Sequence, residues 1–273
     1  MLAPERFGEW LSQNNHVDGF GHAYHYHPRS DAHSVALCTF IAVDLLNSCP
    51  PLRSKIESGE MVFGINAQFR WKATGKVKRL DLAIGPPREP VRLPLQSTLL
   101  SVGSHEETPV SLAQLSILKA DFADVVLSCE AKSVMTEHKK SQPRVYDELN
   151  SSYQMVHQGR QDAIACGITV VNIADTFISP LRQTRLDGLH VTQHRQPKVA
   201  ADMINHLRGL PIRDAVGQVG FDAYATFVVD CSNRCDEPAV LWTAPPAPQP
   251  RERDHYVTFL QRIDRAFTDR FGS

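Results

Sequence analysis

The sequence predicts a mixed α/β fold, in which a central mixed β-sheet is flanked by helices, within a single domain over residues 1–273. Three observations favour this fold. An apolar helix-like segment comes first, three strand-like segments follow it, and an amphipathic helix then leads to a β-branched run. Hydrophobic residues make up 42% of the chain and charged residues 22%, as in ordinary globular proteins.

The first helix is expected over residues 34–47, which are apolar on nearly every side, and Pro50-Pro51 is expected to end it. Residues 61–71 have the composition of a strand. A turn at Gly75 leads into a second strand over residues 77–84. The two strands are therefore expected to form a hairpin.

The third strand is expected around residues 125–132, after a long insertion. A helix is predicted to open at Pro143, with Gly159 or Gly167 as its end, because apolar side chains recur there at helical spacing. Ser152 falls on the same stripe as these apolar side chains. The β-branched run 168–173 is expected to be a strand.

A stiff proline-rich connector over residues 245–250 is expected to lead into a final helix over residues 252–271. No apolar run approaches the length of a membrane span, and residues 1–6 do not resemble a signal peptide. We therefore expect a cytoplasmic protein that does not enter a membrane.

Charged side chains interrupt the second and third strands at positions that share a face. Because side chains alternate along a strand, Glu130 and Lys132 should project together, away from Cys129. The same alternation places Leu80, Leu82 and Ile84 on one side of the second strand and Asp81 on the other. Adjacent strands would bring Asp81, Glu130 and Lys132 to one point, where two carboxylates can hold a hard divalent cation.

The pattern of an acid, a long gap and then Glu130-Ala131-Lys132 resembles the signature of the PD-(D/E)XK nuclease superfamily, which has the restriction-endonuclease-like fold. Leu80 departs from the pattern, since the family name has proline there. The order helix, three strands, helix, strand over about residues 34–175 matches the common core of that family. The resemblance implies that Asp81, Glu130 and Lys132 are catalytic.

The resemblance also implies one or two Mg²⁺ ions, for which Mn²⁺ would substitute, bound by Asp81, Glu130 and a backbone carbonyl near Ala131. Lys132 would orient the attacking water, or act as a base if nearby cations lower its pKa. A further acid is usual on the first helix of the family. We prefer Asp44, which is the acid within residues 34–47, and Glu57 and Glu60 are the alternatives.

A net charge of −1 argues against a protein that coats nucleic acid indiscriminately, but basic residues cluster around the expected site. Candidate DNA-binding residues are Lys76, Lys78, Lys139, Lys140, Arg144, Arg182, Arg185 and Arg195. Polar positions on the helix after the third strand are candidates to support the site, and these are Tyr146, Asn150 and Gln154. The histidine-rich segment His16–His33 is interpreted as a polar loop.

The resemblance implies an endonuclease that cuts double-stranded DNA, of the sequence-specific restriction type, and a homodimer would suit the cutting of two strands. Segments 1–33, 85–120 and 176–273 would supply specificity and the dimer contact, and a cognate methyltransferase is a possible partner. Two alternatives stay open. One is a repair or mobile-element nuclease acting on ends, junctions or RNA, and the other is a binding protein with the same fold and no catalysis.

Overall fold

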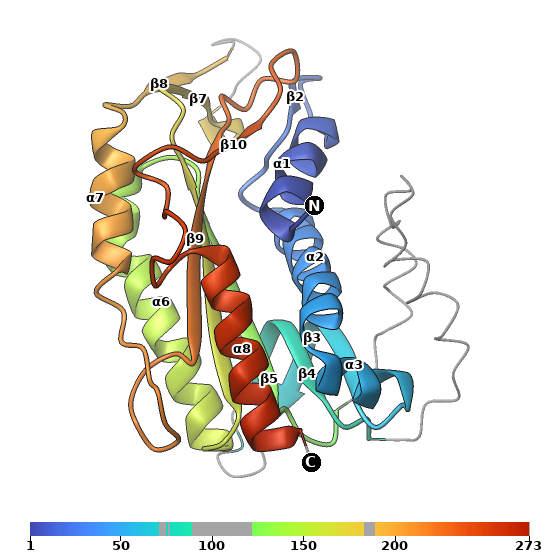
Figure 1. The fold of residues 1–273 in the computed structure, drawn as a ribbon. Coiled ribbons are helices and arrows are strands. Elements are labelled where there is room, and N and C mark those ends of the chain that lie inside the picture. The colour runs from blue at the N-terminus through green and yellow to red at the C-terminus, as the bar shows by residue number, and fades with distance from the viewer. Residues whose placement is uncertain (71–74, 76, 89–121, 183–188, 273) are drawn as a thin grey trace.

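The computed structural model describes residues 1–70, 75, 77–88, 122–182 and 189–272. Its helices are α1 (Ala3–Gln13), α2 (Ala32–Ser48), α3 (Pro50–Glu57), α6 (His138–Gly159), α7 (Lys198–Leu207) and α8 (Tyr256–Phe271). Its strands are β1 (His16–Val17), β2 (Ala23–Tyr24), β3 (Val62–Arg70), β4 (Val77–Gly85), β5 (Leu127–Val134), β6 (Ile164–Asn172), β7 (Thr176–Ile178), β8 (Val191–Gln193), β9 (Ala223–Asp230) and β10 (Val240–Trp242). Figure 1 shows their arrangement.

A six-stranded mixed sheet in the order β10-β9-β6-β5-β4-β3 forms the centre of the protein. Strands β3, β4 and β5 are antiparallel neighbours, β5, β6 and β9 are parallel, and β10 is antiparallel to β9. The predicted mixed α/β class with a helix-flanked central sheet is confirmed at this level. Segments outside residues 34–175 belong to the same sheet, because β9 and β10 extend it.

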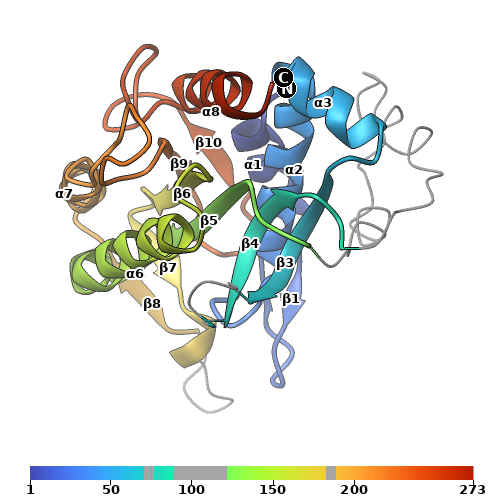
Figure 2. The same cartoon turned by 90° about the horizontal axis from the view of Figure 1, so that it is seen from below.

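Helices cover both faces of the sheet (Figure 2). On one face α1, α2 and α8 enclose a large apolar cluster, to which β5 contributes Leu127, Cys129 and Ala131. On the other face α6 and α7 enclose a second cluster that includes Val134. The alternation of β5 therefore sends its odd-numbered side chains towards α2, as expected, and Glu130 and Lys132 towards α6.

Strand β4 does not alternate as regularly as the sequence suggested. Leu82 belongs to the cluster beneath α2, whereas Leu80 belongs to the cluster beneath α6. The expectation that both share one side is wrong. Pairing between β3 and β4 skips Asn66 and Asp81, and Asn66 adopts a left-handed φ of 57°. Because asparagine tolerates this conformation, the hairpin can twist at the level of Asp81.

Prolines lie at positions in α6 and α3 that differ from the predicted helix boundaries. Helix α6 begins at His138, so Pro143 lies inside it instead of opening it, and Gly159 is its last residue. Pro143 falls in the second turn, where it removes one backbone hydrogen bond near the helix start. Pro50 does follow the end of α2, but it also begins α3, which leaves at 105° to α2.

Two further boundaries differ by a few residues. Strand β6 starts at Ile164, earlier than expected, and Gly167 lies within it. The last helix, α8, begins at Tyr256 because the His255 side chain accepts a hydrogen bond from the Val257 amide and caps it. Within the part of the chain described, no single helix has the length and apolarity of a membrane span. Helices α2 and α3 meet both criteria only when they are counted together as a bent pair.

Candidate functional site

Asp81 and Ala131 are joined where the pairing of β4 with β5 ends. Backbone pairing between the strands runs from Ile84↔Leu127 to Leu82↔Cys129. Beyond this point the Ala131 amide donates a 2.8 Å hydrogen bond to Oδ2 of Asp81. The carboxylate thus takes the role that a backbone carbonyl would have in a continued ladder, and it is held beside Glu130.

Glu130 is almost fully buried and forms ion pairs through both of its oxygens. Nζ of Lys132 lies 2.8 Å from Oε1, and Nζ of Lys78 lies 2.8 Å from Oε2. The Ser152 hydroxyl also donates to Oε2, at 3.0 Å. These contacts satisfy a carboxylate that is only 6% exposed.

Helix α6 contributes two site residues that sequence analysis did not identify as such, Glu148 and Ser152. Oε2 of Glu148 lies 3.1 Å from Nζ of Lys132, and its other oxygen pairs with Arg144 at 2.9 Å. The sequence contained a signal for this, since Ser152 falls on the apolar stripe of α6. A polar residue there faces the sheet and requires a polar partner. Glu148 lies one helical turn before it on the same side.

The two site carboxylates have opposite pKa shifts. Burial, reinforced by repulsion from Glu130, raises the pKa of Asp81 to about 6. Burial also opposes ionisation of Glu130, but the charges of Lys132 and Lys78 outweigh it and lower the pKa of Glu130 below its ordinary value. Both lysines of the site therefore pair with Glu130, and Asp81 is the carboxylate whose charge is less compensated.

The pKa of Lys132 is raised in this arrangement, whereas the base role considered from the sequence requires bound cations to lower it. Burial by itself would lower the pKa, but attraction to Glu130 and to Glu148 exceeds that effect. The expectation assumed neighbouring cations, and the immediate neighbours in the structure are two carboxylates. Lys132 is therefore a firmly charged ammonium group in this arrangement.

Asp44 does not join the carboxylates of β4 and β5. It is buried in α2, where Oδ2 accepts hydrogen bonds from the Ala3 amide at 2.6 Å and the Tyr256 hydroxyl at 2.8 Å, and Oδ1 lies 3.5 Å from Arg6. Its charge is thus used to fasten α1 and α8 to α2. The expectation of Asp44 as a third acid is corrected by these contacts.

The alternatives to Asp44 point elsewhere as well, since Glu60 pairs with Lys55 and Glu57 is exposed at the end of α3. Over the described ranges, no three His, Cys, Asp or Glu side chains converge as a metal site. Oxygen donors near β5 include Asp81, Glu130 and the carbonyl of Ala131, and α6 adds Glu148 and Ser152 at the lysines. Such a set fits a cation that keeps most of its water.

The candidate DNA-binding residues fall into three groups. Lys139, Lys140, Arg144, Arg182 and Arg195 are exposed, and Lys140 and Arg182 share Glu137 at the start of α6. Lys78 instead lies within the Glu130 network. Lys76 and Arg185, together with most of the insertion 85–120, lie outside the described residues.

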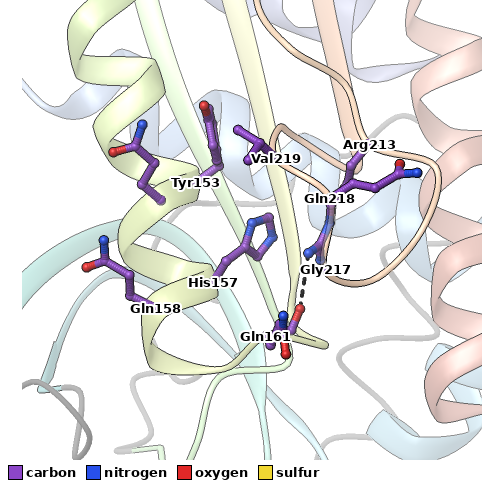
Figure 3. A pocket seen from close by; sticks show the side chains of 9 residues that line it. Tyr153, His157, Gln158, Gln161, Arg213, Gly217, Gln218 and Val219 are labelled. Atoms are coloured by element: carbon purple, nitrogen blue, oxygen red, sulfur yellow. Dashed lines mark hydrogen bonds between the residues drawn. The ribbon is translucent and has the colours of Figure 1, made fainter.

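Two of the three candidate supporting residues on α6 have their contacts away from Glu130. The Tyr146 hydroxyl donates to the carbonyl of Gly209, next to α7, and Asn150 is half-buried. Gln154 lines a separate cavity of about 480 Å³ between α6 and the loop that contains Val219 (Figure 3). Tyr146 and Gln154 therefore do not contact the carboxylate site. The contacts from α6 to this site come from Glu148 and Ser152.

Comparison of the chain with protein-family models, with curated proteins and with solved structures finds no match. What can be stated of the fold is its mixed α/β class and its six-stranded sheet.

Proposed function

We propose that the protein is a Mg²⁺-dependent endodeoxyribonuclease that hydrolyses double-stranded DNA, with Asp81, Glu130 and Lys132 as its catalytic residues. One observation carries the proposal. The strands β4 and β5 hold the two acids side by side, and Lys132 contacts Glu130 at 2.8 Å. A buried pair of acids with an adjacent ammonium is costly for folding, and it suits a site that binds a cation and a phosphate.

The connection of the elements supports the same proposal. Helix α2 precedes the antiparallel β3-β4-β5 unit, and α6 then leads to β6, which is parallel to β5. This order is the one expected from the resemblance to the PD-(D/E)XK superfamily. Figure 2 shows α6 beside β5 and β6, and β4 and β3 continue the sheet beyond α6. DNA would approach the carboxylates over the α6 side of β4 and β3.

The residues fit a magnesium ion with few protein ligands. Mg²⁺ is commonly bound by one or two carboxylates with waters and substrate phosphates, and Asp81, Glu130 and the Ala131 carbonyl offer such a set. When bound, the ion would offset negative charge on the scissile phosphate. Asp81, the less compensated acid, gains most from a cation because its pKa is raised by burial and by Glu130.

Without a bound cation Lys132 is a charged group, and a role as a base would require the bound metal to lower its pKa. Its pKa is raised by Glu130 and Glu148 against the effect of burial, so it carries a proton at neutral pH. An ammonium held in this way can orient the attacking water and stabilise charge that develops on the phosphoryl oxygens. Glu148, on α6, would help to position Lys132 through its second ion pair.

The test is incubation of the purified protein with unmethylated phage DNA and Mg²⁺, followed by the same reaction with a chelator. We expect discrete fragments with Mg²⁺ and intact DNA with the chelator. Lys132→Ala should lose cleavage and keep DNA binding, whereas Lys198→Ala, which removes an exposed lysine of α7, should keep both. Cleavage of linear but not closed circular DNA would indicate a nuclease that processes DNA ends instead of a restriction endonuclease. Intact DNA under every condition would overturn the proposal.

A homodimer would present one active site to each strand of a duplex, so we include a homodimer in the proposal. The dimer is checked by sedimentation of the full chain with and without a DNA duplex. A protein that remains monomeric on DNA while it makes double-strand breaks would contradict this part and leave the nuclease assignment in place.

A further inference from the structure

Lys78 is placed in the site by contacts that its position in the sequence did not suggest. It lies on β4, three residues before Asp81, where it was a candidate for phosphate contact. Its Nζ is instead 2.8 Å from Oε2 of Glu130 and 2.9 Å from the Ser152 hydroxyl. Because Lys132 contacts Oε1, each oxygen of Glu130 is paired with an ammonium group.

The two lysines differ in what they would keep if a metal ion took an oxygen of Glu130. Lys132 also contacts Glu148 at 3.1 Å, so it would retain a carboxylate partner. Lys78 also contacts the neutral hydroxyl of Ser152, and Asp81 attracts it without a direct ion pair. A divalent ion at Glu130 would therefore leave Lys78, about four-fifths buried, next to a like charge.

We propose that Lys78 is an internal cation that occupies Oε2 of Glu130 until a divalent metal displaces it, and that it thereby sets the affinity of the site for the metal. This inference rests on the proposed function, because it assumes that the metal binds at Glu130. It adds a residue outside the Asp81, Glu130 and Lys132 pattern. The competition is direct, since both cations require the same carboxylate oxygen.

Ser152 holds the competing lysine in place. Its hydroxyl contacts both Nζ of Lys78 and Oε2 of Glu130, so the three groups form a closed set between β4, β5 and α6. This arrangement restricts Lys78 to the carboxylate in the absence of a metal. Displacement of Lys78 breaks an ion pair and a hydrogen bond together, which makes metal binding weaker than the two acids alone would allow.

The experiment measures binding of Mn²⁺ to the chelator-treated full chain by titration calorimetry at pH 7.5 without DNA. Lys78→Gln and Lys78→Met remove the charge, and the methionine keeps the aliphatic stem. Lys78→Arg keeps the charge. Lys198→Gln, on α7, controls for the loss of one positive charge from the protein. Thermal unfolding of each variant shows whether it is folded.

We expect Lys78→Gln and Lys78→Met to tighten the Kd for Mn²⁺ at least tenfold, while Lys78→Arg and Lys198→Gln stay within about twofold of wild type. Detectable binding by the two neutral variants alone would also support the inference. Equal affinities for wild type and the neutral variants would overturn it and leave the proposed function standing. Absence of binding by wild type and all variants would overturn the proposed metal site as well. Failure of both neutral variants to fold would contradict a displaceable role for Lys78.

Discussion

Asp81 is expected to destabilise the metal-free protein, so that Asp81→Asn should increase its stability at neutral pH. The pKa of Asp81 rises from 3.8 to about 6 because burial and Glu130 disfavour its charge. A shift of about two pKa units corresponds to roughly 3 kcal/mol of unfolding free energy. The asparagine carbonyl can still accept the hydrogen bond from the Ala131 amide, so the substitution removes the charge and keeps the contact.

The pH dependence follows from the direction of the shift. Below about pH 4 Asp81 is protonated in both the folded and the unfolded chain, so its ionisation has no effect on stability. Between about pH 4 and 6 the folded chain keeps a proton that the unfolded chain releases, and stability falls as the pH rises. The full cost is therefore present above about pH 6, where Asp81→Asn should be more stable than wild type by about 2 to 3 kcal/mol.

Urea unfolding of the chelator-treated protein at pH 7.5 and pH 4.5 measures both quantities, with Asp202→Asn on the exposed side of α7 as a matched control. The advantage of Asp81→Asn should be largest at pH 7.5 and fall to about a third of that value at pH 4.5. A variant that is no more stable than wild type at pH 7.5 would refute the reasoning. An advantage of the same size at both pH values would show that it does not come from the charge of Asp81.

Three other substitutions test the core and the site. Asn172→Ala should lower the unfolding free energy by about 3 kcal/mol or more in chemical denaturation, because its buried amide makes four hydrogen bonds that join the ends of β5, β6 and β9. Asp222→Asn should cost about 3 to 5 kcal/mol in the same assay, since it leaves the fully buried Arg213 without its ion-pair partner. Glu148→Gln should slow DNA cleavage about tenfold in a rate assay, because it removes the second carboxylate that orients Lys132.

Strand periodicity was sufficient to predict how Glu130 and Lys132 relate to each other. Two residues two positions apart on a strand must share a face, and their nitrogen and oxygen atoms meet at 2.8 Å. The side chains of β5 are regular because the strand lies in the interior of the sheet, paired on both sides. The order of α2, β3, β4, β5, α6 and β6 was likewise predictable, because each of these elements has a distinct periodicity, whereas α3 was not predicted.

Contacts between elements could not be predicted in the same way. The twist of β4 at Asp81 depends on the φ of Asn66 in the neighbouring strand, which no pattern within β4 contains. Asp44 was correctly identified as a carboxylate in an apolar helix that needs a partner, but its partners come from α1 and α8. Periodicity identifies the face of an element, and the structure is needed to identify what lies against that face.

The distribution of charge over the two acids connects the proposals. Lys78 and Lys132 both pair with Glu130, and so the pKa of Glu130 is lowered while that of Asp81 is raised by burial and by Glu130. A divalent cation between the acids would relieve Asp81 and displace Lys78, and these two effects oppose each other. The stability gained by Asp81→Asn measures the cost of the buried Asp81 charge. The affinity gained by Lys78→Gln measures how strongly Lys78 competes with the metal for Glu130. If both gains are found, the buried charge of Asp81 destabilises the metal-free site, and Lys78 competes with the metal for Glu130.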